Sequence, residues 1–166
     1  MRQLTERYLT SLTLDDLHKK MVFISGPRQV GKTTMAMDLA PRGSRYLNWD
    51  VEEDRQFVLH QEIPRQRFVI YDEIHKFQRW RDYLKGVFDK YGHTKRILVT
   101  GSARLDYYRY SGDSLQGRYF LYRLHPLSVA ELGIETQKDF EALLNLGGFP
   151  EPFFSASQRE ARRWAR

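Results

Sequence analysis

Residues 22–37 have the sequence Val-Phe-Ile-Ser-Gly-Pro-Arg-Gln-Val-Gly-Lys-Thr-Thr-Met-Ala-Met and are the most informative stretch of the chain. Within them, residues 26–33 fill the pattern Gly-x-x-x-x-Gly-Lys-Ser/Thr at every required position. Gly26 and Gly31 let the backbone bend tightly and approach a polyphosphate without a clash from a Cβ atom. Successive backbone N–H groups then point inward, and the following helix offers the positive end of its dipole. This stretch therefore predicts a site for a nucleoside triphosphate.

The residues on either side of the loop fit the same prediction. Residues 21–24 are an apolar run of strand length, and residues 33–39 indicate the start of a helix, which disfavours a chance match in a glycine-containing turn. Lys32 would reach the β- and γ-phosphates, and the hydroxyl of Thr33 would bind Mg²⁺. The residues expected to contact the nucleotide are Gly26, Pro27, Arg28, Gln29, Val30, Gly31, Lys32, Thr33 and Thr34.

Residues 67–73, Arg-Phe-Val-Ile-Tyr-Asp-Glu, are a continuous apolar run that ends in two adjacent acids. Such a run predicts a central parallel strand that is buried on both faces. Asp72 would hold Mg²⁺, usually through its water shell, and Glu73 would orient and polarise the attacking water. Two carboxylates at the end of a buried strand are costly without a compensating cation or network, so a purely structural role is disfavoured.

Residues 96–102 predict another buried strand, and hydroxyl groups lie at its end. In a doubly wound sheet this end comes beside the γ-phosphate, so Thr100 or Ser102 could sense it. For Ser102 the alternative is an N-cap of the following helix, and the two hydroxyls share a strand face.

Arg118 directly precedes the last predicted strand, residues 119–124. Ring-forming ATPases present an arginine finger to a neighbouring subunit from this position. A surface arginine, or a phosphate contact within its own site, is the alternative. Three further polar residues lie near predicted strand ends. For Asn48, holding a catalytic carboxylate in an inactive pose and an ordinary structural role are about equally favoured, whereas Asp50 is favoured as a helix cap. His75 is favoured as a packed residue over a proton shuttle or phosphate sensor.

Composition limits the class of protein. At 166 residues, with 41% hydrophobic and 29% charged residues, the chain is expected to form one globular domain. The sequence has no cysteine, so disulfides and cysteine–zinc sites are excluded, and no apolar run reaches the ~18 residues of a membrane helix. Since the N-terminus is polar and lacks a secretory pattern, we expect a cytoplasmic protein without a membrane partner. The net charge of +6 is compatible with nucleic-acid binding, although a solvated basic surface is the simpler explanation because no dense Lys/Arg block occurs.

The motif set resembles the AAA-like P-loop ATPases of bacteria and archaea, a family of the AAA+ superfamily whose ATPase domain is usually followed by a C-terminal domain of unknown function. The matching pieces are residues 26–34, Tyr-Asp-Glu-Ile-His-Lys at 71–76, Thr-Gly-Ser-Ala at 100–103, Leu-Gln-Gly-Arg at 115–118, His-Pro-Leu-Ser-Val-Ala-Glu-Leu at 125–132 and Gly-Gly-Phe-Pro-Glu-Pro at 147–152. The first two are shared by many ATPases, whereas the last two are more specific to this group.

The resemblance implies an α/β fold, a three-layer P-loop NTPase with a five-stranded parallel sheet in the order 5-1-4-3-2 and a short helical lid. It divides the chain into an ATPase core, 1–126, and a lid, 127–166, in which residues 127–132 and 137–146 indicate short helices. It implies ATP and Mg²⁺ as cofactors, with Lys32 and Thr33 on phosphate and Mg²⁺, Asp72 on Mg²⁺, and Glu73 as the catalytic carboxylate. Pro150, in a Gly-x-Pro element of the lid, would lie near the adenine. A helical pattern that runs to residue 166 without a stop signal suggests a longer natural protein.

The leading functional hypothesis is therefore an ATP-hydrolysing domain, with a homo-oligomer as a candidate assembly. A nucleic-acid-stimulated translocase or helicase module and a nucleotide switch with low turnover are the alternatives. The sequence contains no Asn-Lys-x-Asp element for guanine recognition, which favours ATP over GTP.

Overall fold

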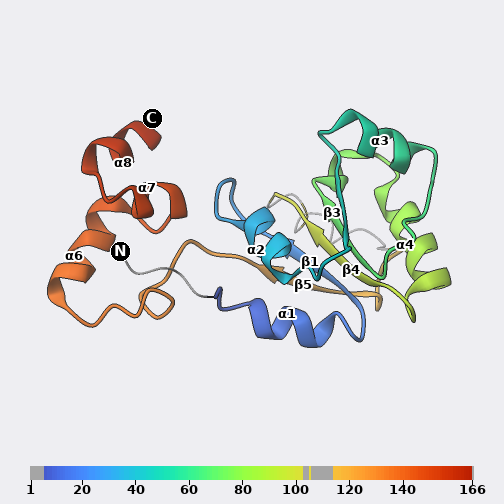
Figure 1. The fold of residues 1–166 in the computed structure, drawn as a ribbon, viewed down its shortest axis with the longest axis horizontal. Helices are drawn as coiled ribbons and strands as arrows, with labels where there is room; N and C mark the ends of the chain where they lie inside the picture. The colour runs from blue at the N-terminus through green and yellow to red at the C-terminus, as the bar shows by residue number, and fades with distance from the viewer. Residues whose placement is uncertain (1–5, 103–104, 106–113, 166) are drawn as a thin grey trace.

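One sheet of five parallel strands forms the centre of the computed structural model, which describes residues 6–102, 105 and 114–165 (Figure 1). The strands are β1 (Met21–Ser25), β2 (Arg45–Asn48), β3 (Phe68–Asp72), β4 (Arg96–Thr100) and β5 (Tyr119–Arg123). Their order is β2-β3-β4-β1-β5, and each neighbouring pair is parallel. This order equals 5-1-4-3-2 counted from the opposite edge, so the predicted P-loop NTPase fold is confirmed.

Helices cover both faces of the sheet. Before residue 127 they are α1 (Thr10–Asp16), α2 (Lys32–Leu39), α3 (Glu52–Leu59), the short 3₁₀ helix η1 (Ile74–Lys76) and α4 (Trp80–Tyr91). Residues 127–166, the predicted lid and called the lid below, contain α6 (Gln137–Leu146), α7 (Pro150–Ser155) and α8 (Gln158–Trp164). Within the described residues, no helix has the length and apolar character that a bilayer span requires.

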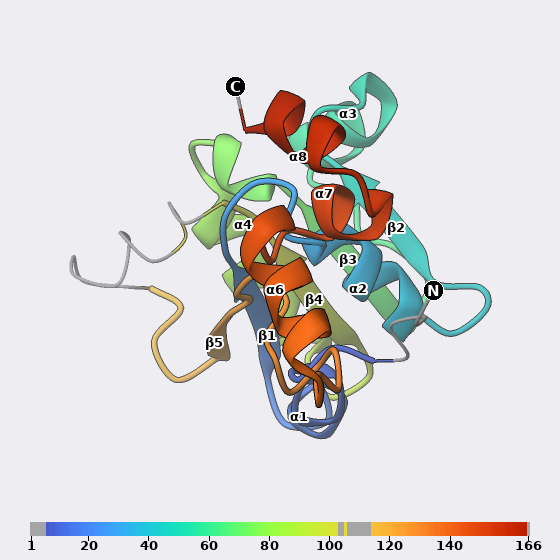
Figure 2. The ribbon, with the colours of Figure 1, turned by 90° about the vertical axis from the view of Figure 1, so that its left-hand side faces the viewer.

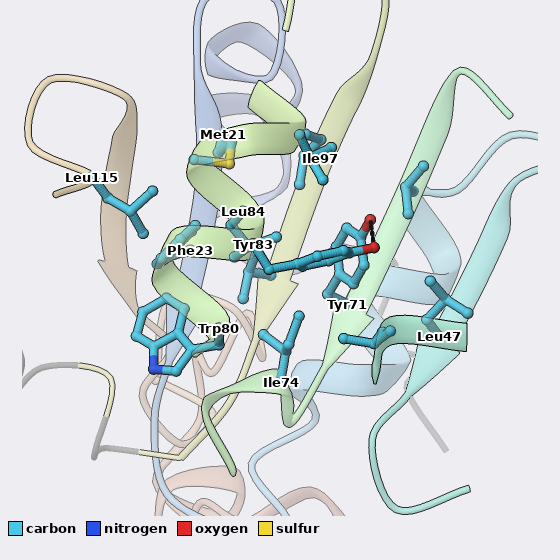
Figure 3. Close-up of a cluster of buried hydrophobic side chains, with 14 of the residues drawn as sticks. Met21, Phe23, Leu47, Tyr71, Ile74, Trp80, Tyr83, Leu84, Ile97 and Leu115 are labelled. Atoms are coloured by element: carbon cyan, nitrogen blue, oxygen red, sulfur yellow. Dashed lines mark hydrogen bonds between the residues drawn. The ribbon is translucent and has the colours of Figure 1, made fainter. Parts of the chain in front are cut away.

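Alternation along the strands produces two separate apolar layers, because successive strand side chains point to opposite faces. Residues such as Met21 and Phe23 pack with α4, where Trp80 and Leu84 are buried (Figure 3). The intervening Val22 faces the other layer, which contains side chains of α2 and the leucines at the two ends of α1, Leu9 and Leu17. The central strands are buried along their whole length, as their continuous apolar sequence predicts.

The lid helices gather at one end of the molecule, and Figure 2 views the protein from that end with α7 in front of α2. Phe149 joins the lid to the core. Its ring packs against the apolar layer beside α2 and also lies 4.7 Å, centroid to centroid, from the ring of Trp164 in α8. The lid therefore packs on the same side of the sheet as the loop between β1 and α2.

The expectation of a helix at residues 127–132 is wrong, because this segment forms only a single turn. Ser128 and Glu131 close that turn through reciprocal bonds, in which Ser128 N donates to Glu131 Oε2 at 3.0 Å and Glu131 N donates to Ser128 Oγ at 3.2 Å. Gly133 follows with a φ of +55°, a left-handed conformation that ends the turn before a helix can propagate.

Candidate nucleotide site

The loop between β1 and α2 requires glycine at two positions. Gly26 has a φ of +155°, and a Cβ atom there would come within 2.5 Å of the backbone oxygen of Leu124. Gly31 has a φ of +94° and is the left-handed residue that precedes α2. Gly26 is thus needed because β5 ends against the loop, a constraint in addition to the close approach to phosphate that the motif predicts.

Lys32 lies inside the loop and is only 8% exposed. Its Nζ donates to the backbone oxygens of Gly26 at 3.1 Å and Pro27 at 2.6 Å. Burial lowers the pKa of Lys32, and the nearby charges of Glu73 and Asp72 oppose that shift. The Lys32 ammonium group is therefore held by backbone carbonyls of the loop, close to the carboxylates of Asp72 and Glu73.

Asp72, at the end of β3, accepts hydrogen bonds from three hydroxyl groups on three different elements. Oδ2 accepts from Thr33 Oγ1 of α2 at 2.8 Å and from the Tyr46 hydroxyl of β2 at 2.7 Å. Oδ1 accepts from Thr100 Oγ1 of β4 at 2.5 Å. Since the carboxylate is 5% exposed, these donors compensate for its burial. The predicted pair Thr33 and Asp72 thus meets at the base of the loop.

Tyr46 is a site residue that sequence reasoning missed. Burial raises the pKa of its hydroxyl, and the hydrogen bond to Asp72 and the charge of Asp72 raise it further, so it remains a donor near neutral pH. In this part of the sequence, only Asn48 and Asp50 are predicted as candidate functional residues. No feature of the local sequence identifies Tyr46 as a site residue, since its hydroxyl reaches the Asp72 carboxylate only because β2 pairs with β3.

Glu73 immediately follows β3 in a left-handed conformation, with a φ of +56° that is uncommon for a residue with a side chain. Its backbone N donates to the oxygen of Thr100 at 3.0 Å, which fixes this conformation. Its Oε2 lies 3.5 Å from Lys76 Nζ, and Lys76 also bonds Asp50 at 2.6 Å. The same Oε2 is 3.8 Å from His75 Nε2. Glu73 is therefore held at the edge of the loop by a cation that it shares with Asp50.

The hydroxyls of Thr100 and Ser102 have different surroundings. Thr100 is fully buried and bonds Asp72, whereas Ser102 Oγ lies 3.2 Å from His75 Nε2. The His75 side chain is 5% exposed and packs so closely on Gly101 that a Cβ there would lie 2.7 Å from Nδ1. The helix that Ser102 was expected to cap falls on residues outside the described part of the chain.

At the end of β2, the alternative that Asn48 restrains a catalytic carboxylate and the prediction that Asp50 caps the next helix are both wrong. Asn48 Oδ1 accepts from the backbone N of Asp50 at 3.0 Å, so Asn48 closes its own turn instead of restraining Glu73. Asp50 pairs with Lys76 and is not the cap of α3. The side chain of Asp54 in α3 reaches back to the Asn48 backbone N at 2.9 Å, which fixes the entry into the helix.

A cavity of about 520 Å³ lies over the loop. It is lined by Arg28, Gln29, Gly31, Lys32, Thr33, Thr34, Glu73, Pro150 and Glu151. Gly26, Pro27 and Val30 belong to the predicted loop but do not line the cavity; two of them use their carbonyls to hold Lys32. Pro150 of the lid faces the loop, and its Cγ would lie 3.8 Å from a Cβ on Gly31. This cavity is therefore lined by the loop between β1 and α2, by Glu73 and by the first residues of α7 in the lid.

A protein-family model described as an AAA domain matches residues 18–133, which is more than half of the chain. The chain belongs to the AAA domain family. The predicted family, AAA-like P-loop ATPases, is thereby confirmed. The matched part runs from the residues before β1 to the turn after β5, so it includes the loop and both acids.

Two curated relatives, uncharacterized proteins of Mycobacterium tuberculosis and Mycobacterium bovis, are each 27% identical to this AAA domain over 157 residues. The match covers 89% of this chain and 34% of each relative, so the chain spans about a third of their length.

Two solved structures show the same fold. A signal-transduction ATPase with numerous domains and a tetratricopeptide-repeat sensor, from Pyrococcus horikoshii, gives a TM-score of 0.56 at 16% identity over 90% of this chain and 29% of that chain. A Walker-type ATPase of Pyrococcus abyssi gives 0.51 at 13% identity over 99% of this chain and 73% of that chain.

Arg118 of this AAA domain is not brought into the site. It precedes β5, so in a parallel sheet it lies at the edge opposite the loop that follows β1. There it pairs with Asp89 of α4, with Nε at 2.6 Å from Oδ1 and Nη2 at 3.2 Å from Oδ2. The alternative of a phosphate contact within its own site is therefore wrong.

Arg7 is a second residue that sequence reasoning missed. This guanidinium is buried and bonds three separate segments: Glu131 Oε1 at 2.8 Å, the oxygen of Val30 at 2.8 Å and the oxygen of His125 at 2.6 Å. Burial alone would raise the pKa of Glu131, but hydrogen bonds from Arg7 and from the backbone N atoms of Ser128 and Tyr8 lower it overall. Arg7 thus ties the phosphate loop to the turn at which the lid begins.

Proposed function

We propose that this AAA domain binds ATP together with Mg²⁺ and hydrolyses it. The observation that carries the proposal is the cavity over the loop, which Lys32, Thr33 and Glu73 line together. Lys32 would contact the transferred phosphate, and Glu73 would accept a proton from the attacking water.

The residues at the base of the loop fit Mg²⁺. This ion takes oxygen ligands and is usually held by one or two protein groups together with phosphate oxygens and water. Asp72 and Thr33 supply a carboxylate and a hydroxyl whose oxygens are 2.8 Å apart. No group of three or more His, Cys, Asp or Glu in the described residues could hold a metal alone, so the nucleotide would complete the ligand set. Bound there, Mg²⁺ would neutralise charge on the phosphates.

The other predicted residues would act at greater distance. Thr100, which bonds Asp72, would orient that carboxylate, and Ser102 would act through His75. Pro150 would contact the base from the lid. Backbone N–H groups of residues 28–34 would cradle the phosphates at the start of α2.

Mg²⁺-dependent phosphate release, measured for the wild type and for Glu73→Gln, tests this function. The variant keeps the size of the side chain but loses the base, so we expect turnover to fall by roughly a hundredfold or more with nucleotide affinity retained. Glu53→Gln, at an exposed position in α3, is the matched control and should turn over like the wild type. Equal rates for Glu73→Gln and the wild type would refute the proposed base. Lys32→Ala should instead weaken nucleotide binding itself.

A second candidate is a nucleotide switch with low turnover. It is favoured by the position of Lys76, whose Nζ is 3.5 Å from the Glu73 carboxylate and which is anchored by Asp50. A base that is paired with a cation is less available to water. This candidate predicts tight ATP binding with negligible steady-state hydrolysis, which a single-turnover measurement distinguishes from efficient catalysis.

Homo-oligomerisation remains a proposal. For Arg118 to reach a neighbouring subunit it would have to leave Asp89, to which it is joined by two hydrogen bonds. ATPase activity measured against protein concentration tests this, since a trans-acting arginine makes specific activity rise with concentration and Arg118→Ala should abolish that rise.

A further inference from the structure

A second cavity, of about 510 Å³, lies at the edge of the sheet opposite the nucleotide site. Four chain connections form it: residues 17–18 before β1, 41–44 before β2, 67–68 at the start of β3, and 92–96 before β4. Because all strands are parallel, the connections that enter them meet at one edge, and in Figure 1 those from α1 into β1 and from α4 into β4 lie away from the lid helices. We call this cavity the basal hollow. Its volume is close to that of the nucleotide cavity.

The lining of the basal hollow is basic. Its six basic residues are His18, Arg42, Arg67, His93, Lys95 and Arg96, and none of the described lining residues is acidic. Each of the four connections contributes at least one of them. Such convergence of one sign of charge around a depression focuses a positive potential within it.

Three arginines of the basal hollow differ in their pairing from Arg45 and Arg118, which lie elsewhere in the core. Arg45 bonds Asp54 at 2.9 Å, and Arg118 bonds Asp89. In contrast, within the described part of the chain, no carboxylate lies within ion-pair distance of Arg42, Arg67 or Arg96 (these three are called the hollow arginines). The basal hollow therefore holds cationic groups whose charge the protein itself leaves unneutralised.

Arg96 faces another basic side chain. Its Nη2 lies 3.1 Å from Nδ1 of His18. Since a guanidinium can only donate, Nδ1 accepts in this contact. The contact brings two basic side chains from two different connections together in the hollow.

Two of the hollow arginines are positioned by regular structure. The Arg96 backbone N donates to the oxygen of Arg67 at 2.7 Å, at the point where β3 and β4 begin to pair. Lys95 Nζ donates to the oxygens of Pro64 at 2.5 Å and Gln66 at 2.8 Å, which ties the two strand entrances together. A site on strand ends holds its groups more precisely than a site on long loops.

We propose that the basal hollow binds the phosphate groups of a polyanion, with the backbone of a single nucleic-acid strand as the favoured source. Guanidinium groups bind phosphate in a bidentate manner and retain their charge at every physiological pH. The hollow arginines are all exposed and come from three separate connections. An extended strand carries a phosphate group on each nucleotide and so suits several separated arginines better than one small free polyphosphate does. This site is separate from the nucleotide cavity and does not depend on ATP hydrolysis.

Fluorescence anisotropy with a labelled single-stranded DNA of about 15 nucleotides tests the proposal over a range of salt concentrations. The triple variant Arg42→Gln/Arg67→Gln/Arg96→Gln should lose roughly tenfold or more in affinity, and its slope of log affinity against log salt should fall by about two. The control Arg159→Gln/Arg162→Gln/Arg163→Gln removes the same charge from α8 and should bind like the wild type. An equal loss in both triple variants would overturn the proposal. No DNA binding by the wild type at low salt would rule out a nucleic-acid strand as the ligand, and the proposal as a whole fails if the hollow substitutions also leave pyrophosphate binding unchanged.

A free polyphosphate is distinguished by titration of pyrophosphate. Because pyrophosphate also fits the phosphate loop, the titration uses Lys32→Ala, with and without the three hollow substitutions. Binding of pyrophosphate that the hollow substitutions remove, without binding of DNA, supports the phosphate site and assigns it to a free ligand. Arg42→Glu, at an exposed turn residue, is a second variant that should weaken binding even if the triple variant does not fold.

Discussion

Tyr46 donates a hydrogen bond of 2.7 Å from its hydroxyl to Oδ2 of Asp72, the oxygen that also accepts from Thr33. Two donors thus fix the orientation of one carboxylate oxygen at the base of the phosphate loop. Without Tyr46, Thr33 and Thr100 alone would hold Asp72.

We predict that Tyr46→Phe costs about 1–2 kcal/mol of unfolding free energy, because a buried acceptor loses one of its donors. It should also raise the Mg²⁺ concentration needed for half-maximal nucleotide binding, because Asp72 is less well oriented. Urea unfolding and Mg²⁺ titration measure the two effects. Tyr91→Phe removes a hydroxyl that makes no hydrogen bond within the described residues and should change neither; a similar loss there would contradict the role of Tyr46.

Lys76 is predicted to restrain Glu73. Partly exposed ion pairs are worth up to about 1 kcal/mol, so Lys76→Gln should raise steady-state ATP turnover by no more than about fivefold. Asp50→Asn should act in the opposite direction, since it releases Lys76 from Asp50 and leaves it to Glu73. Phosphate-release rates at saturating ATP test both variants. A fall in turnover for Lys76→Gln would show that the lysine assists catalysis.

Arg7→Lys should destabilise the fold by about 3 kcal/mol, because a lysine cannot replace three directed bonds and Glu131 would be left with a poorer partner. The loss should be accompanied by weaker ATP binding, since Arg7 bonds the carbonyl of Val30 in the phosphate loop. Lys138→Arg, at an exposed position in α6, is the reciprocal control. Denaturant unfolding with and without ATP separates the two effects: if ATP stabilises variant and wild type equally, Arg7 serves the fold alone.

Stability should depend on pH through Glu131. Its pKa is lower in the folded protein than the ordinary value of 4.5, so its contribution is complete above that value and is lost as pH falls through the folded pKa. The stability difference between the wild type and Glu131→Gln should therefore be largest near neutral pH and should shrink below pH 4.5. Urea midpoints measured at several pH values provide the test, and a difference that is independent of pH would contradict it.

Two glycine substitutions should have opposite effects. Gly26→Ala places a Cβ 2.5 Å from the Leu124 backbone oxygen at a strained φ, so we expect a loss of roughly 2 kcal/mol or more. Gly86 lies in the middle of α4, and a Cβ there meets nothing within 4 Å. Gly86→Ala should therefore gain about 0.5–1 kcal/mol from helix propensity. Thermal or urea unfolding compares the two, and a neutral Gly26→Ala would show that the end of β5 can move away.

Local patterns were sufficient for the fold and for part of the site. Buried parallel strands require continuous apolar runs, and the loop requires glycines with a lysine and a hydroxyl at fixed offsets, so β1, β3, β4 and the residues Lys32 and Thr33 could be recognised in isolation. Asp72 and Glu73 could be recognised for the same reason, since acids that directly follow a buried strand are costly without a function. The meeting of Thr33 with Asp72 then follows from two parallel strands that end at the same edge.

Contacts between distant segments could not be found in this way. Arg7 and Glu131 are separated by 124 positions and Tyr46 and Asp72 by 26, and nothing in the local sequence of any of them indicates its partner. Sheet order and register bring Tyr46 to the carboxylate, place Arg118 at the opposite edge, and gather the hollow arginines from three connections. A sequence pattern reports the backbone and burial preferences of neighbouring residues, whereas these side-chain contacts exist only after strands and lid have packed.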